Sequence, residues 1–274
     1  MTTKTLHTTK SATVTSADGT TLAVDTVGTG APVILIGGAF NDRSTVAALA
    51  AELAPKFSAV TYDRRRRGGS DDRSEYYTIQ SEFDDLAAVI AHVGGRASVF
   101  GHSSGAVLAM AGTLYGLPID KLAMYEPPYI ADGNRPAPPA DLLDRLEALV
   151  RAGDREGAVE LFLLESVGAP PEMVAGMRAS DAWGFLLTQA DSLPYDVLVT
   201  GPDLRMPVEL MAALTTPTLA VYGDQTWPWL AAATKAVAEA VPGAELVEIK
   251  GEDHGILAHP EALEPALAEF FGRG

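Results

Sequence analysis

Residues 97–105 read Ala-Ser-Val-Phe-Gly-His-Ser-Ser-Gly, and this stretch decides the fold of the chain. The residues before Gly101 predict a short buried strand, and those after Gly105 predict a helix. Residues 101–105 match the pattern G-x-S-x-G, in which the glycines allow a cramped turn from strand to helix. Such a turn lifts the hydroxyl of Ser103 clear of the sheet, so Ser103 is the candidate nucleophile.

Strands and helices alternate on both sides of this motif. The expected strands are a hairpin over 13–27 with its turn at 17–19, followed by 32–36, 57–62, 97–100, 121–125, 218–222 and 245–249. Helical patterns cover 44–53 and 79–93, and others begin near Gly105 and flank the last strand. This alternation is typical of βαβ units. It predicts an α/β fold with a mostly parallel, eight-stranded sheet and helices on both faces.

A long segment without strand character interrupts the alternation after the sixth strand. It opens with a proline-rich stretch and shows helical patterns over 142–150, 158–166 and 183–187. We expect residues 130–211 to form a helical lid over the carboxyl edge of the sheet. The core would then comprise 1–129 and 212–274. Trp183 in the lid, together with Phe40 and Trp227, is a candidate substrate contact.

Charge and composition exclude several classes of function. The chain has 274 residues, with 36 Asp and Glu against 20 Lys and Arg, a net charge of -16. This acidity argues against nucleic acid as a partner, and the basic run 64–67 is too short to reverse it. Asp84 and Asp85 are expected on a solvated helix face. With no cysteine, the chain can form neither a disulfide nor a thiolate metal site.

Motifs for cofactors, membranes and export are also missing from the sequence. No metal-ligand spacing and no G-x-G-x-x-G after the first buried strand is present, so neither a metal nor a dinucleotide cofactor is expected. The N-terminus lacks the apolar region of a secretory signal, and no apolar run approaches the length of a membrane span. A cytoplasmic protein without a membrane partner is therefore expected, and the sequence does not indicate an oligomeric state.

His254 is the candidate general base. It lies in Gly-Glu-Asp-His-Gly, residues 251–255, just after the last strand, where a loop histidine can reach a serine at the sheet edge. The other histidines fit this role less well. They are His7 in the N-terminal tail, His92 at a helix end, His102 beside Ser103, and His259 in the final helix.

Taken together, these motifs resemble those of α/β-hydrolase-fold enzymes over roughly residues 14–271. A further match is 63–70, Asp-Arg-Arg-Arg-Arg-Gly-Gly-Ser, which is similar to the family's D-x-R-G-x-G-x-S turn with Arg66 at the first glycine. We interpret that turn as scaffolding. The resemblance implies a triad of serine, acid and histidine and an oxyanion hole. The N–H groups of Ser104 and of Gly38 or Ala39 would form that hole, although Gly37 replaces the family's usual histidine.

The acid of the triad has two candidates. The family commonly places it in G-x-x-D after the strand 218–222, but the corresponding position here is Thr226, and Asp224 comes two residues early. Glu126 directly follows the strand that ends at Tyr125, as in zearalenone-type lactonases. Because both strand ends flank the histidine loop, either carboxylate can orient the imidazole. Glu126 is preferred, with Asp224, or neither, as the alternative.

The predicted function is that of a serine hydrolase. It would cleave a carboxylic ester or lactone of a small to medium apolar substrate through an acyl-enzyme. The same triad also serves C–C bond hydrolysis, perhydrolysis or a cofactor-free lyase step. The sequence does not distinguish these reactions from hydrolysis of an ester or lactone. An alternative of another class is a receptor-like protein that binds a small ligand with little turnover.

Overall fold

The computed structural model describes residues 8–74, 76–131, 133 and 135–273, so His7 lies outside it. Within these residues, one eight-stranded sheet has the order β1-β2-β4-β3-β5-β6-β7-β8. The strands are β1 (Lys10–Thr15), β2 (Thr21–Gly28), β3 (Pro32–Ile36), β4 (Ser58–Tyr62), β5 (Ala97–His102), β6 (Ile119–Tyr125), β7 (Thr218–Gly223) and β8 (Glu245–Ile249). β2 pairs antiparallel with β1 and β4, and the remaining pairs are parallel. The predicted fold class is confirmed.

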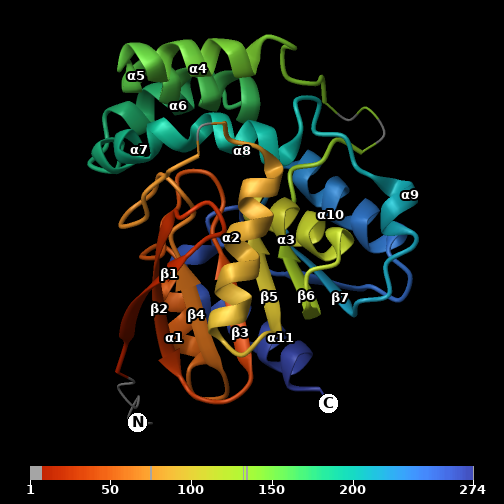
Figure 1. The fold of residues 1–274 in the computed structure, drawn as a ribbon. Coiled ribbons are helices and arrows are strands. Elements are labelled where there is room, and N and C mark those ends of the chain that lie inside the picture. The colour runs from red at the N-terminus through yellow and green to blue at the C-terminus, as the bar shows by residue number, and fades with distance from the viewer. Residues whose placement is uncertain (1–7, 75, 132, 134, 274) are drawn as a thin grey trace.

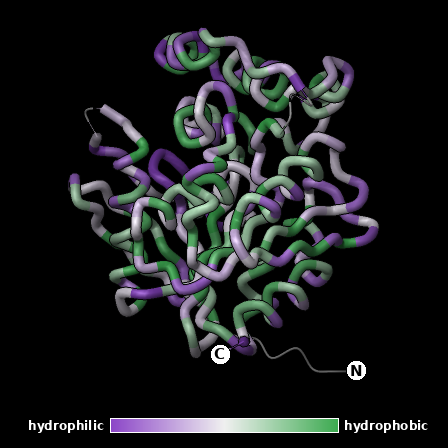
Figure 2. Tube along the Cα trace, turned by 90° about the vertical axis from the view of Figure 1, so that its right-hand side faces the viewer, coloured by the Kyte–Doolittle hydropathy of each residue, from purple (hydrophilic) through white to green (hydrophobic). Residues whose placement is uncertain are grey.

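Helices cover both faces of the sheet because its central strands are apolar on both sides. In β3, Val33 and Leu35 pack in the core that includes α1 and α11, whereas Ile34 and Ile36 pack in the core that includes α2, α3 and α10. These helices are α1 (Ala47–Leu53), α2 (Ile79–His92), α3 (Ser104–Tyr115), α10 (Pro228–Ala240) and α11 (Pro260–Gly272). Figure 2 shows hydrophobic segments concentrated in the interior of the molecule.

Further helices lie between β6 and β7. They are α4 (Leu142–Ala152), α5 (Arg155–Leu161), a π-helical turn (Phe162–Val167), α6 (Pro171–Arg178), α7 (Trp183–Gln189), α8 (Leu193–Thr200) and α9 (Val208–Met211). Helices α4 to α8 form a layer at one end of the sheet, opposite α11 (Figure 1). Their apolar side chains build a separate core, against which Phe40 from the β3 end packs.

The parallel register brings several loops to one edge of the sheet. Ile36 pairs with Gly101, His102 with Tyr125, and Tyr125 with Val221, so β3, β5, β6 and β7 end side by side. The loops that follow these strands therefore meet at the edge nearest the layer of helices. None of the helices in the described ranges has the length and apolarity needed to cross a bilayer.

Candidate active site

Ser103 occupies a sharp turn between β5 and α3. Its backbone has φ +55° and ψ −123°, a left-handed conformation that residues other than glycine rarely adopt. A Cβ at Gly101 would collide with the backbone of Gly105 and Ala106, and one at Gly105 would collide with the carbonyl of Ile36. The N–H of Ser103 donates to the carbonyl of Tyr125 at 2.9 Å. The two glycines thus permit the turn, and β6 fixes it.

Glu126 follows β6 with φ +46°, a second strained residue at the same edge. Its side chain is fully buried. Oε1 accepts a hydrogen bond from the N–H of Gly223 at 2.9 Å, and Oε2 accepts one from the hydroxyl of Thr226 at 2.8 Å. Oε2 also lies 2.6 Å from Nδ1 of His254. These donors compensate for the burial of a carboxylate.

The His254 loop is held in place by three neighbouring residues. Besides the contact to Glu126, the backbone carbonyl of His254 lies 2.9 Å from Nε2 of His102, and the hydroxyl of Tyr125 donates to the carbonyl of Asp253 at 2.7 Å. Burial and the nearby His254 lower the pKa of His102 to about 3, so His102 is neutral and its Nε2–H donates. Burial and the charge of Glu126 raise the pKa of Tyr125, which keeps its phenol a donor.

Asp224 points to a different partner. It is exposed, and its carboxylate accepts a hydrogen bond from the N–H of Gly251 at 2.7 Å. Its own N–H donates to the carbonyl of Ile249. Asp224 therefore shapes the turn after β8, whereas the structure joins Glu126 to His254.

The loop after β3 lies against the serine. A Cβ on Gly38 would come within 2.7 Å of Cβ of Ser103, so only glycine fits there. The N–H of Gly38 donates to Oδ1 of Asn41 at 3.0 Å and is thereby occupied. In the described part of the chain, no hydrogen bond takes the N–H of Ala39 or Ser104. Of the sequence-predicted donors, these two are available to an oxyanion.

A cavity of about 580 Å³ opens over these residues. Its lining includes Ser103, His254, Phe40 and Trp227. Much of the remaining wall is apolar, and the helices between β6 and β7 contribute Phe162, Leu163, Val167, Met173, Met177 and Leu186 to it. The π-helical turn supplies several of these, and such turns are frequent at functional sites.

Trp183 does not line this cavity. The ring is buried in the core formed by the helices between β6 and β7, and the guanidinium of Arg178 lies 5.9 Å from its centre. The helical pattern does not distinguish a position facing the cavity from one facing neighbouring helices, and the structure places Trp183 at the latter.

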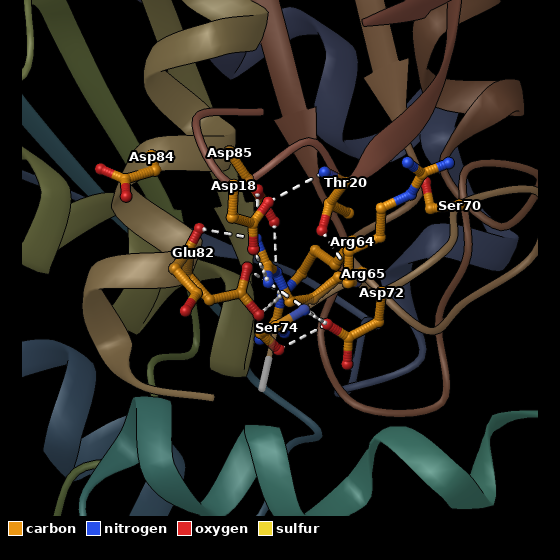
Figure 3. A network of polar contacts seen from close by, with 12 residues as sticks. Asp18, Thr20, Arg64, Arg65, Ser70, Asp72, Ser74, Glu82, Asp84 and Asp85 are labelled. Carbon is orange, nitrogen blue, oxygen red and sulfur yellow. Dashed lines mark hydrogen bonds and ion pairs between the residues drawn. The ribbon is translucent and has the colours of Figure 1, made fainter. Parts of the chain in front are cut away.

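Three arginines of the run after β4, Arg64, Arg65 and Arg67, are buried and paired with acids, whereas Arg66 is exposed. Figure 3 shows Arg64 and Arg65 pointing toward Glu82 and toward acidic residues that include Asp85, Asp18 and Asp72. Arg65 binds both carboxylate oxygens of Asp85, at 2.8 and 2.7 Å. The expectation that Asp85 lies on a solvated face is therefore wrong, because a buried guanidinium faces it from outside α2.

Two polar residues at the site, Asp196 and Asn41, belong to no motif in the sequence. Asp196, on α8, is buried in the cavity wall and accepts a hydrogen bond from the hydroxyl of Ser104 at 2.7 Å. Asn41 holds the N–H of Gly38. No feature of the sequence marks Asp196 as a site residue, because it lies in a helical pattern far from any motif. Across the described ranges, no group of three His, Cys, Asp or Glu side chains is arranged to hold a metal ion.

Comparison with known proteins gives a consistent family assignment. Residues 28–266 match the model of the alpha/beta hydrolase family. An alpha/beta hydrolase from Sphaerobacter thermophilus is 42% identical, with a TM-score of 0.89 over 95% of this chain and 100% of that one. The 2-(acetamidomethylene)succinate hydrolase of Mesorhizobium japonicum is 27% identical over 91% of each chain. The enol-lactonase from Burkholderia xenovorans shares the fold at 19% identity, with a TM-score of 0.73 over 96% of this chain and 100% of that one. The chain therefore belongs to the alpha/beta hydrolase family and is an enzyme of the serine-hydrolase type.

Proposed function

We propose that this enzyme hydrolyses a carboxylic ester or lactone through an acyl-enzyme on Ser103. The observation that carries the proposal is the 2.6 Å contact between Oε2 of the buried Glu126 and Nδ1 of His254, in a loop that shares one cavity with Ser103. A carboxylate on Nδ1 fixes the imidazole tautomer and leaves Nε2 to accept a proton. In this proposal Glu126, and not Asp224, is the acid of the triad.

Acylation begins with attack of Ser103 Oγ on the substrate carbonyl carbon. The hydroxyl proton moves to Nε2 of His254, and the negative charge of Glu126 stabilises the resulting imidazolium. The carbonyl oxygen becomes an oxyanion that the N–H groups of Ala39 and Ser104 bind. Removing one such donor typically costs about 2.7–4 kcal/mol of transition-state stabilisation.

Collapse of this intermediate breaks the carbon–oxygen bond of the ester. His254 returns its proton to the departing alkoxide, which leaves as an alcohol or, from a lactone, stays attached as a hydroxyl on the acyl chain. A water molecule then gives its proton to His254 and attacks the acyl carbon. The second tetrahedral intermediate expels Ser103 Oγ, which regains a proton, and the carboxylic acid is released.

The shape and lining of the cavity support an apolar substrate of small to medium size. A volume of about 580 Å³ is within the usual range for small-molecule pockets. Phe40 and Trp227 line the same cavity as Ser103 and provide aromatic surface, and the helical segment adds apolar side chains such as Phe162, Met173 and Leu186. We assign residues 130–211 the role of a lid, with 1–129 and 212–274 as the hydrolase core.

The test is turnover of nitrophenyl esters of increasing acyl length and of a set of lactones. Wild type is compared with Ser103→Ala, Glu126→Gln and Asp224→Asn, the last being a matched control because an Asn can still accept from Gly251. We expect the first two variants to lose most activity and the control to retain it. Mass spectrometry of wild type mixed with a slow ester should find the acyl group on Ser103.

Two results would contradict the proposal. Wild type that binds these compounds without turning them over would favour a ligand-binding protein. An Asp224→Asn variant as inactive as Glu126→Gln, with its fold intact by circular dichroism, would return the acid to the usual family position.

A further inference from the structure

Behind the candidate oxyanion hole lies a buried set of charges. It consists of Arg64, Arg67, Glu82 and Asp196, and we call it the Arg67–Asp196 network. Nη2 of Arg67 lies 2.5 Å from Oδ2 of Asp196, and Nη1 of Arg64 lies 2.8 Å from Oδ1 of Asp196. Arg64 also pairs with Glu82 at 2.7 Å, and Figure 3 shows these two side chains facing each other. Two guanidinium groups thus balance two carboxylates.

Arg67 holds the peptide that carries the Ala39 donor. Its Nη1 donates to the carbonyl of Gly38 at 2.6 Å and to that of Asn41 at 3.1 Å. The Gly38 carbonyl and the Ala39 N–H belong to one trans peptide unit, so they point in opposite directions. Fixing the carbonyl on Arg67 therefore fixes the direction of the N–H. A cationic donor on the carbonyl also polarises the peptide and strengthens that N–H as a donor.

Asp196 holds the residue that carries the second donor. The hydroxyl of Ser104 donates to Oδ1 of Asp196 at 2.7 Å, which secures the first residue of α3. Burial disfavours the charged form of Asp196, but Arg67 and Arg64 outweigh it and hold the pKa of Asp196 below its ordinary value. One ionised carboxylate on α8 is therefore linked to Ser104 directly and to the Gly38–Ala39 peptide through Arg67.

We propose that Arg67 and Asp196 are positioning residues of the oxyanion hole, an inference that rests on the proposed function. Burying four charges carries a large desolvation penalty, which a purely apolar contact between α8 and the sheet would avoid. The network offsets that penalty with hydrogen bonds that lead to both donor peptides. The donors are thus held in place before the oxyanion forms.

The experiment measures how fast an alkyl fluorophosphonate reacts with Ser103. Oγ attacks phosphorus, fluoride leaves, the serine proton passes to His254, and the phosphoryl oxygen occupies the oxyanion position, so the rate reports on the hole without a known substrate. The variants are Arg67→Lys, Asp196→Asn and Ser104→Ala, of which the last preserves every ion pair. The control is Arg65→Lys, which alters an equally buried pair that does not contact the loop after β3.

We expect Arg67→Lys and Asp196→Asn to react about ten- to a hundred-fold more slowly than wild type. This decrease in rate is no larger than the decrease that removal of one oxyanion-hole donor causes. Ser104→Ala should show a smaller decrease, and Arg65→Lys should react like wild type. The pH at which the rate is half-maximal should stay constant, because His254 and Glu126 are untouched. A variant that merely damages the fold of the site would also disturb the contact between His254 and Glu126, and the pH of half-maximal rate would then change.

Several outcomes would overturn the inference. If Arg67→Lys and Ser104→Ala react as fast as wild type, the inference is wrong and the proposed function is unaffected. The same holds if Arg65→Lys slows the reaction as much as Arg67→Lys does. A shifted pH midpoint would place the effect on His254 instead. If wild type itself is not labelled on Ser103, the proposed function and this inference both fail.

Discussion

The hydroxyl of Thr226 donates a hydrogen bond to Oε2 of Glu126 at 2.8 Å, the same oxygen that contacts His254. Thr226 occupies the position after β7 at which related enzymes commonly carry the acid. The residue at the usual acid position therefore supports a carboxylate that comes from the neighbouring strand. The end of β6 thus supplies the carboxylate that contacts His254, and the loop after β7 supplies a hydrogen-bond donor to that carboxylate.

This contact predicts that a carboxylate at position 226 can replace the carboxylate at position 126. Glu126→Gln should reduce kcat by about 10²–10⁴-fold, since the imidazolium loses its counter-charge. Adding Thr226→Asp to that variant should recover about ten-fold or more, because a carboxylate then returns to the same face of the imidazole. Steady-state kinetics on one nitrophenyl ester measures both effects.

Thr226→Asp alone serves as the control for this exchange. It places a second carboxylate beside the buried Glu126, so the single variant should be slower and less stable than wild type. No recovery in the double variant, with the fold intact, would show that position 226 cannot reach His254.

His102 should make stability depend on pH. Its pKa is about 3 in the folded protein against 6.5 ordinarily, so below pH 6.5 the unfolded chain binds a proton that the native state excludes. The contribution is complete above pH 6.5 and is lost at about 1.4 kcal/mol per pH unit as the pH falls toward 3. Urea unfolding at several pH values should give a shallower dependence for His102→Gln than for wild type. Equal slopes would contradict the prediction.

Arg66 provides a test of backbone strain. It has φ +64°, and its guanidinium lies 5.7 Å from the ring centre of Tyr195. Arg66→Ala and Arg66→Gly both remove this contact and differ only in the Cβ. Because a left-handed conformation costs about 1–2 kcal/mol when a Cβ is present, the Gly variant should be the more stable of the two. Thermal unfolding compares them, and an Ala variant of equal or higher melting temperature would refute the argument.

The cavity lining predicts which tryptophan affects substrate binding. Trp227→Ala should raise KM for medium-chain esters, because Trp227 lines the cavity. Trp183→Phe should leave KM unchanged, since Trp183 lies in the core of the helical segment and its buried indole N–H has no partner among the described residues. A KM that responds to position 183 instead would mean that the ring reaches the substrate.

Local patterns sufficed for much of the fold and part of the site. The glycines at 101 and 105 predicted the turn at Ser103 because only a few backbone conformations connect a strand to a helix so tightly. Arg66 could be recognised as lying at a glycine position, and it has the positive φ that this implies. Such features depend on neighbours in the chain, which the sequence displays directly.

Long-range polar contacts could not be predicted in the same way. Arg67 and Asp196 are 129 residues apart, and no periodicity indicates that they meet. The sequence predicts a solvated position for Asp85 because an acid on a helix is usually exposed, and only the folded chain brings Arg65 to it. The orientation of Trp183 likewise depends on how the helices pack, which their hydrophobic pattern leaves open.

The hydrogen bond between Ser104 and Asp196 limits how this protein can be recombined. Exchanging segments between relatives is a common route to new specificity, and it treats the part outside the sheet as an interchangeable module. Here residues 130–211 bring with them the carboxylate that faces the first residue of α3. A chimaera with a foreign segment would need an acid at the place of Asp196, or it would leave Arg67 and Arg64 buried without their shared counter-charge.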